Sequence, residues 1–278
     1  MCIPDSQGSL ASSPGALKRS RTRIFILSLL SLGTMINYLD RTILGIVAPK
    51  LTTEIHIDPA MMGIVFSAFA WTYALAQIPG GMFLDRFGNK LTYALSIFFW
   101  SLFTLLQSFS LGLKSLLLLR LGLGVSEAPC FPANSRIVSK WFPQHERARA
   151  TATYTVGEYI GLAAFSPLLF LILEHHGWRT LFFLTGGLGI LFTFVWWRFY
   201  HEPHESKTAN KAELDYIGAD QVANKSENIP FNWRDARRLL CCRQIIGASL
   251  GQFAGNTTLV FFLTWFPTYL ANERHLPW

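Results

Sequence analysis

Residues 116–135 read LLLLRLGLGVSEAPCFPANS, a stretch that predicts a membrane-spanning helix although it contains Arg120 and Glu127. A charged side chain in the middle of a membrane costs about 2.5–3.5 kcal/mol on insertion scales, so two in one helix need a physical reason. At about 100° per residue, Glu127 returns to the face of Arg120, about 10 Å further along the helix axis. This face cannot contact lipid, and we expect it to line a bundle interior or a wet cavity that forms a site.

Two structural alternatives remain open for Arg120. Its side chain could snorkel to the lipid headgroups, because Lys114 marks the start of the helix only a short distance before it. It could instead take part in a purely structural ion pair. Glu127 is harder to explain in either way, because it lies nearer the middle of the span and has a shorter side chain.

The composition indicates a membrane protein. Of the 278 residues, 51% are hydrophobic and only 15% are charged, whereas soluble domains average about 25% charged residues. Uncharged runs that are long enough to span a membrane cover residues 60–84, 91–113, 180–197 and 244–272. Three further runs, which begin near residues 24, 115 and 150, reach that length if they include charged residues. We therefore predict an all-α membrane protein with seven transmembrane helices.

The basic residues are distributed asymmetrically along the alternating loops. Of the 24 Lys and Arg residues, two lie inside predicted helices, four lie on one side of the membrane, and the remaining 18 lie on the other side. Cytoplasmic loops are enriched in Lys and Arg, so we expect a multi-pass protein of the cell membrane with its N-terminus in the cytoplasm. The net charge of +7 then reflects topology and not a nucleic-acid-binding surface.

These helices divide the chain into five predicted parts. They are a disordered cytoplasmic tail (1–23), a six-helix transmembrane bundle (24–200), a cytoplasmic linker (201–243), a seventh transmembrane helix (244–272) and an outer end (273–278). The first helix is expected to end near Val47, with Pro49 as a natural stop. A basic cytoplasmic loop is expected over residues 136–149.

Polar residues on the first two helices extend the candidate site. Tyr38 and Arg41 share one helix face, whereas Asp40 points about 100° away, toward a neighbouring helix. Alternatively, Asp40 and Arg41 mark the outer end of a short helix. On the second helix Tyr73 and Gln77 form one polar strip. The third helix is predicted to serve packing only.

The loop GMFLDRFGNK, residues 81–90, resembles the signature loop of the major facilitator superfamily. The residues that carry this resemblance, as a gating loop, are Gly81, Asp85, Arg86, Gly88 and Lys90, whereas Asn89 departs from the usual basic residue. The resemblance implies two six-helix halves around a midplane site, with Asp85 and Arg86 holding the first half against a helix of the second. From its position, Asp85 is also expected to accept hydrogen bonds from backbone N–H groups at a helix start.

Further features narrow the resemblance: NYLDR (37–41), Tyr73, Arg120 with Glu127, and WFPQHERARA (141–150). Together they resemble the anion:cation symporter branch, whose bacterial members import sugar acids such as galactonate and glucarate. For such a substrate we expect Arg41 and Arg120 to bind the carboxylate with charge-assisted hydrogen bonds. The substrate hydroxyls are expected to meet Tyr38, Tyr73 and Gln77.

The buried acids are expected to couple transport to protons. Protonation of Asp40 and Glu127 would free the arginines for the substrate, and release of both to the cytoplasm would complete the symport that the resemblance implies. Glu158 lies between glycines of a close-packing GxxxG pattern on the fifth helix, where many relatives carry glutamine. We place it in the substrate site, where it is either protonated or paired at rest or biases the choice of substrate.

No pattern points to an enzyme, a cofactor or a metal. The glycine clusters near residues 122 and 186 lie inside apolar spans without a preceding strand, so they do not form a dinucleotide-binding fingerprint. The four cysteines have neither metal-ligand nor secreted-disulfide spacing.

Six helices, a linker and one further helix correspond to a half transporter plus the first helix of the other half. We therefore expect a truncated chain that imports a sugar acid with protons only when the missing second half is supplied, and that is inactive alone. Its partners would be the small organic anion, protons, membrane lipid and that second half. The alternatives are a transporter of another organic anion, such as an aromatic carboxylate or dicarboxylate, a non-transporting membrane sensor, and an inert fragment.

Overall fold

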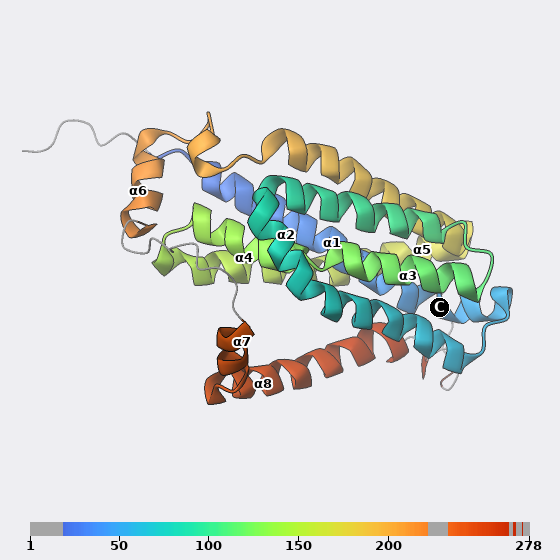
Figure 1. The fold of residues 1–278 in the computed structure, drawn as a ribbon. Coiled ribbons are helices and arrows are strands. Elements are labelled where there is room, and N and C mark those ends of the chain that lie inside the picture. The colour runs from blue at the N-terminus through green and yellow to red at the C-terminus, as the bar shows by residue number, and fades with distance from the viewer. Residues whose placement is uncertain (1–18, 222–232, 267–268, 271–273, 275–278) are drawn as a thin grey trace, which may run out of the picture.

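The computed structural model of the chain describes residues 19–221, 233–266, 269–270 and 274 (Figure 1). Within these residues it contains helices and no β-strand, which confirms the predicted all-α class. Most of the predicted tail and of the predicted outer end lies outside the described residues. In chain order the elements are α1 (Thr22–Ile55), α2 (Pro59–Gln107), α3 (Leu113–Glu127), α4 (Cys130–Trp141), α5 (Gln144–Phe199), the 3-10 turn Pro203–Glu205, α6 (Lys211–Gln221), α7 (Trp233–Leu240), α8 (Arg243–Val260) and the π-helical turn Phe261–Trp265.

Two glycines divide two very long helices into four arms. The 49 residues of α2 and the 56 of α5 are each more than twice the length needed to cross the apolar core of a bilayer, which is about 20 residues. Each helix is broken where a glycine has a positive φ, 77° at Gly88 and 78° at Gly177, a conformation that favours glycine. Four described helical stretches are long and apolar enough to cross a membrane: Thr22–Ile55, Ala60–Gln107, Leu113–Trp141 and Gln144–Phe199. Because α2 and α5 are each divided in two, these stretches provide six helical segments, the number of crossings predicted for the bundle.

Two helix ends differ from those that hydropathy predicts. α1 continues through Pro49 to Ile55, so the predicted end near Val47 is wrong. A proline removes one N–H group and its hydrogen bond, but packed membrane helices tolerate this loss. The second arm of α2 also ends earlier than predicted, at Gln107 and not at residue 113.

The predicted basic loop over residues 136–149 is also wrong. α4 extends to Trp141 and α5 begins at Gln144, so only Phe142 and Pro143 separate the two helices. Hydropathy marks only the part of a helix that lies in lipid. Beyond that part, charged residues continue the same backbone hydrogen bonding in contact with water.

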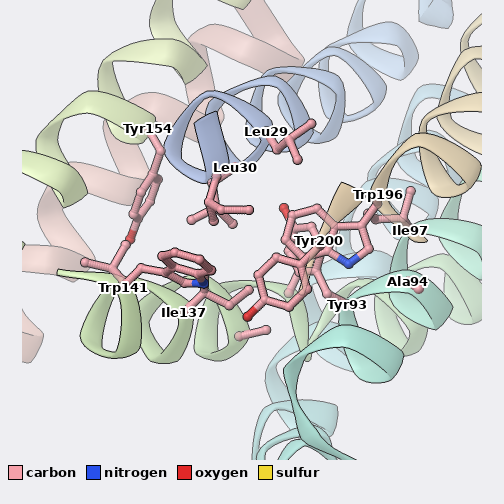
Figure 2. Close-up of a cluster of buried hydrophobic side chains, with 14 of the residues drawn as sticks. Leu29, Leu30, Tyr93, Ala94, Ile97, Ile137, Trp141, Tyr154, Trp196 and Tyr200 are labelled. Atoms are coloured by element: carbon pink, nitrogen blue, oxygen red, sulfur yellow. The ribbon is translucent and has the colours of Figure 1, made fainter. Parts of the chain in front are cut away.

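Two clusters of buried apolar side chains hold the bundle together, one on either side of the middle of α1. The first fills the end at which α1 begins, where the ring of Trp196 stacks on Tyr200 at 4.4 Å and lies 4.2 Å from Tyr93 (Figure 2). The second contains Leu51 of α1 and Phe182 of α5. The charged residues in the middle of α1 therefore lie between two well-packed regions.

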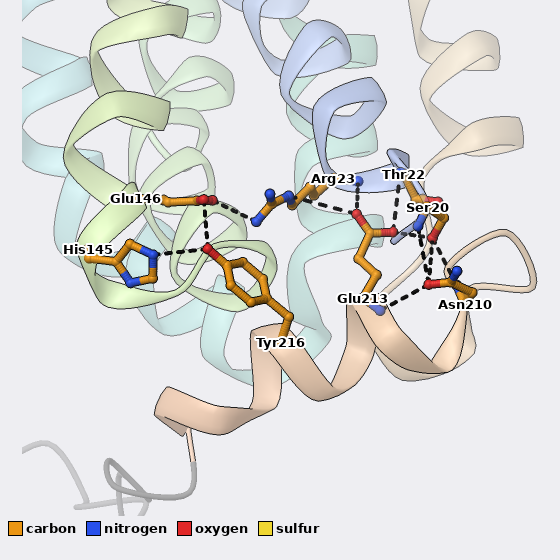
Figure 3. Close-up of polar contacts among 8 residues, drawn as sticks. All are labelled: Ser20, Thr22, Arg23, His145, Glu146, Asn210, Glu213 and Tyr216. Carbon is orange, nitrogen blue, oxygen red and sulfur yellow. Dashed lines mark hydrogen bonds and ion pairs between the residues drawn. The ribbon is translucent and has the colours of Figure 1, made fainter. Parts of the chain in front are cut away.

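The helix α6, within the predicted linker, caps the beginning of α1 (Figure 3). Its Glu213 is fully buried and accepts hydrogen bonds from the backbone N–H groups of Thr22 at 3.3 Å and Arg23 at 3.2 Å. The Ser20 hydroxyl donates to the same carboxylate. The sequence analysis did not predict this helix or its contacts.

A second set of contacts joins α6 to the beginning of α5. The hydroxyl of Tyr216 donates to Glu146 at 2.8 Å and lies 3.0 Å from Nε2 of His145 (Figure 3). Glu146 also forms an ion pair with Arg23 of α1 at 2.7 Å. Together these contacts fasten α1, α5 and α6 to one another at one end of the bundle.

The helix α8 stands apart from the bundle along most of its length (Figure 1). Beyond α8, the ring of Trp265 lies 5.7 Å from that of Phe66 in α2. Among the described residues, α8 is not one of the helical stretches long and apolar enough to cross a membrane. Its role as a seventh transmembrane helix therefore stays a prediction.

Candidate substrate site

Arg41 and Glu127 form an ion pair between α1 and α3, in which Glu127 is buried and Arg41 is half-buried. Nε of Arg41 donates to Oε1 of Glu127 at 2.6 Å, and Nη2 pairs with the same oxygen. Glu127 is only 1% exposed. Breaking such a pair would leave the charge of Glu127 buried and uncompensated, which is costly. The contact therefore holds α1 and α3 together as long as Glu127 is ionised.

Four aromatic rings surround the guanidinium of Arg41. Its central carbon lies 5.1 Å from the ring centre of Tyr38, 5.0 Å from that of Tyr73, 5.3 Å from that of Phe69 and 5.7 Å from that of Phe131. These distances permit cation–π interactions, which stabilise a cation without neutralising it. The sequence analysis predicted the two tyrosines and missed the two phenylalanines, although each phenylalanine lies four residues from a predicted site residue, a spacing that helices bring together.

Asp40 points toward a different helix, as predicted. Its Oδ2 accepts a hydrogen bond from Nε1 of Trp100 at 3.1 Å, and Asp40 is 3% exposed. The alternative in which Asp40 marks a helix end is wrong, because α1 continues for many residues beyond it. Trp100 lies on the second arm of α2, which was predicted to serve packing only. That prediction is wrong here because an indole adds an N–H donor to a largely apolar side chain.

Arg120 is buried, and two of its nitrogens have no hydrogen-bond partner. The residue is 4% exposed, and Nε and Nη2 make no hydrogen bond within the described part of the chain. Its burial argues against the snorkelling alternative, and the ion pair of Glu127 forms with Arg41 instead. A buried charge without partners is costly, so Arg120 has donors available for an anionic ligand.

Glu158 and Gln77 differ in how close they lie to the other residues of the candidate site. Glu158, on α5, is 4% exposed and interacts with the Tyr38 hydroxyl. Gln77 is half-buried one turn along α2 from Tyr73, and its side chain makes no hydrogen bond among the described residues. The structure therefore brings Glu158 to the candidate site and leaves Gln77 at its edge.

The predicted gating loop, residues 81–90, lies at the end of the bundle where α1 begins. The prediction of a loop is wrong except at Gly88, because the residues on either side of this glycine continue the two arms of α2. Asp85 accepts a hydrogen bond from Nη1 of Arg136 at 2.8 Å, and the same nitrogen donates to the Leu84 carbonyl at 3.1 Å. The expected capping of a helix start by Asp85 is therefore wrong. The Asp85 side chain is 79% exposed, and an exposed ion pair contributes little to stability.

The other gating-loop residues make weak contacts or none. The Arg86 guanidinium lies 5.6 Å from the ring centre of Phe87, and the Lys90 ammonium lies 5.3 Å from that of Trp197. A Cβ atom added at Gly81 would meet nothing within 4 Å. Packing within the described residues therefore does not explain the glycine at position 81.

The unpaired donors of Arg120 suit an anionic ligand. The group combines the buried Arg120 and the half-buried Arg41 with three buried carboxyl groups and two phenol groups, from α1, α2, α3 and α5. In the part of the chain that the structure describes, no group of three His, Cys, Asp or Glu side chains could hold a metal ion.

Comparison with known sequences identifies the family. The profile of the Major Facilitator Superfamily matches residues 30–278. The chain belongs to this superfamily. The resemblance drawn from the signature loop is thereby confirmed, and the superfamily consists of membrane transporters.

Several similar curated proteins are named as sugar-acid transporters. The chain is 46% identical to the "D-galactonate transporter" of Escherichia coli O6:H1 (strain CFT073) over 266 residues, which cover 93% of this chain and 62% of that protein. It is 42% identical to the "Probable galactarate/D-glucarate transporter GudP" of Escherichia coli K12 over 272 residues, which cover 92% of this chain and 60% of that protein. The chain thus spans about 60% of the length of these relatives.

A solved structure shares the fold. It is that of a bacterial homologue of the human lysosomal transporter Spinster, in an inward-facing and unoccupied conformation. The TM-score is 0.68 at 22% sequence identity, with 92% of this chain and 57% of that chain covered. At this identity the similarity establishes the arrangement of the helices and nothing about the substrate.

Proposed function

We propose that this chain provides the sugar-acid-binding half of a transporter that imports its substrate together with protons. The observation that carries the proposal is Arg120, a buried cation whose Nε and Nη2 have no partner within the described residues. The names of the two relatives, a D-galactonate transporter and a probable galactarate/D-glucarate transporter, support a sugar acid as the anion.

The site fits the chemistry of a sugar acid. A guanidinium group binds a carboxylate through two parallel hydrogen bonds, and Arg120 has free donors for this contact. Tyr38 and Tyr73 flank Arg41, and their hydroxyls can meet the polyol part of the substrate. Aromatic rings beside Arg41 keep a cation in place when its carboxylate partner is neutralised.

The pair of Arg41 and Glu127 provides a route for proton coupling. A proton on Glu127 neutralises the carboxylate and releases Arg41, which can then join Arg120 in binding the substrate anion. Loss of that proton restores the ion pair and weakens the hold on the anion. Asp40, bound to Trp100 through one oxygen, is the second acid that we assign to proton transfer.

Uptake of labelled substrate tests this function. The chain is joined to the remaining C-terminal part of the D-galactonate transporter, and this chimera is expressed in cells that lack related transporters. We expect accumulation of one or more of galactonate, glucarate and hexuronate that stops when the proton gradient is collapsed. Uptake of only aromatic carboxylates, or of only dicarboxylates without the hydroxyl groups of a sugar acid, would overturn the sugar-acid assignment. Absence of any uptake by a folded, membrane-inserted chimera would support a sensor or an inert fragment.

We also propose that the N-terminus and α6 lie in the cytoplasm. The support is the excess of Lys and Arg on that side of the predicted membrane. Reporter fusions after Lys211 and after Trp278 should report opposite compartments. The same compartment for both fusions would contradict a seventh crossing by α8 and the residues that follow it.

A further inference from the structure

A cavity lies at the end of the bundle where α1 begins, separate from the Arg41 site. Its volume is about 620 Å³, which falls in the range of about 300–1,000 Å³ typical of small-molecule sites. Its walls come from the first turns of α1, the end of α5 and residues 201–208. Figure 1 shows α1 and α5 converging with α6 at this end of the bundle.

One side of the cavity carries an excess of positive charge. Arg21, Arg198 and Lys207 line it, and none of the three forms an ion pair with another described residue. The lining contains a single acid, Glu205, whose side chain is 58% exposed. Three cations against one acid in a concave surface attract an anion.

The other side of the cavity is aromatic and lies at the ends of two helices that are long and apolar enough to cross a membrane. Phe25 and Phe199 line it, with ring centres 5.8 Å apart in an edge-to-face arrangement. They are 46% and 48% exposed, and they lie in the first turn of the α1 span and at the last residue of the α5 span. A small water-soluble anion would leave these rings uncovered, whereas the acyl chains of a lipid would cover them.

We infer that this cavity binds an anionic glycerophospholipid from the surrounding membrane. Its phosphate lies among Arg21, Arg198 and Lys207, and the first carbons of its acyl chains lie against Phe25 and Phe199. Basic pockets between transmembrane helices near the membrane surface bind such headgroups. The bound lipid joins the start of α1 to the end of α5 and to the segment that leads to α6. This site is independent of the transported substrate.

The test uses the purified chain in detergent, with lipid binding measured by native mass spectrometry. Phosphatidylglycerol is compared with the zwitterionic phosphatidylcholine of the same acyl chains, and with glycerol 3-phosphate, which has the phosphate without the acyl chains. We expect binding of phosphatidylglycerol at concentrations at which the other two do not bind. Removing one cation should weaken binding about fivefold, and the double variant Arg198→Gln/Lys207→Gln about 25-fold, since each basic group near a lipid surface contributes about 1 kcal/mol.

The control variant is Arg149→Gln, because Arg149 is an exposed basic residue of α5 that does not line the cavity. It should bind phosphatidylglycerol as the unchanged chain does. Equal binding of phosphatidylcholine would overturn the proposal, because the negative charge of the lipid would then not matter. An equal loss in Arg149→Gln would overturn it too, because basic charge anywhere on the protein would then explain the binding. Equal binding of glycerol 3-phosphate would show a site for a soluble phosphate and would overturn it as well. If the double variant does not fold, Lys207→Gln alone carries the test, because Lys207 is exposed.

Discussion

Glu213, at one end of the bundle, and Glu127, in its middle, are both almost completely buried, at 0% and 1% exposure. Glu213 accepts hydrogen bonds from two backbone N–H groups of α1 and from the Ser20 hydroxyl. Glu127 has its hydrogen bond and ion pair with a single side chain, Arg41, from another helix. The two acids therefore depend on different kinds of partner.

This difference separates a structural acid from a switchable one. Backbone donors at a helix start are fixed in number and position, so the contacts of Glu213 persist as long as α1 does. A side-chain partner can turn to another anion, and Arg120 stands buried nearby with free donors. We therefore expect substitutions at Glu213 to act on stability, and substitutions at Arg120 and Glu127 to act on transport.

The largest effect is expected from Arg120→Ala in the chimera. The substrate carboxylate loses its binding partner in a buried site, and such losses amount to about 2–5 kcal/mol, or about 30-fold to several thousandfold in affinity. Substrate exchange across proteoliposome membranes should fall to background, while the amount of folded protein stays unchanged. Arg149→Ala is the control and should keep exchange. If Arg120→Ala reduces folded protein and not exchange, Arg120 is structural.

The second prediction concerns Glu127→Gln. Glutamine keeps a polar side chain of the same size but cannot lose or gain the coupling proton. Net accumulation driven by a proton gradient should collapse, and its dependence on external pH should disappear, whereas exchange of substrate should survive. Continued accumulation against a gradient would assign the proton to Asp40 or Glu158.

The third prediction tests the structural acid. Glu213→Ala leaves the backbone N–H groups of Thr22 and Arg23 without their acceptor, so we expect the free energy of unfolding to fall by about 1–3 kcal/mol. Thermal unfolding of the purified chain in detergent measures this loss. Asp215→Ala, an exposed acid of the same helix, should leave the unfolding temperature unchanged. A similar loss in both variants would mean that charge on α6, and not the capping, stabilises α1.

The smallest effect is expected from Trp100→Phe. It removes the indole N–H that donates to Asp40, a contribution of about 1 kcal/mol, and keeps most of the ring. Protonation of Asp40 should become easier, because a donor that stabilises its ionised form is gone. The pH at which uptake by the chimera is half-maximal should therefore rise by less than about one unit. An unchanged pH profile would remove Asp40 from the proton pathway.

Much of the fold could be predicted from the sequence because its physical causes are local. Seven apolar runs long enough to cross a bilayer, three of which include charged residues, predicted the helices. The glycine of the signature loop lies where the chain reverses between two of them, with φ of 77° at Gly88. The helix ends could not be predicted in the same way. α1 continues beyond Pro49 and α4 continues to Trp141. Hydropathy indicates only which residues lie in the apolar part of a membrane, whereas the backbone hydrogen bonds of a helix continue beyond that part.

The candidate site shows the same division. Helical periodicity alone placed Arg120 and Glu127 on one buried face and turned Asp40 away from Arg41, since angular positions within one helix follow from residue spacing. The partners across helices depended on tertiary packing: Glu127 meets Arg41 of α1, Asp40 meets Trp100 of α2, and the donors of Arg120 stay free. The spacing of residues along one helix gives no information on how a neighbouring helix is rotated about its axis or shifted along it. For that reason the sequence determined that Arg120 and Glu127 are buried within a membrane span, and only the tertiary structure decided which of the buried charges are paired, and that Glu213 is one of them.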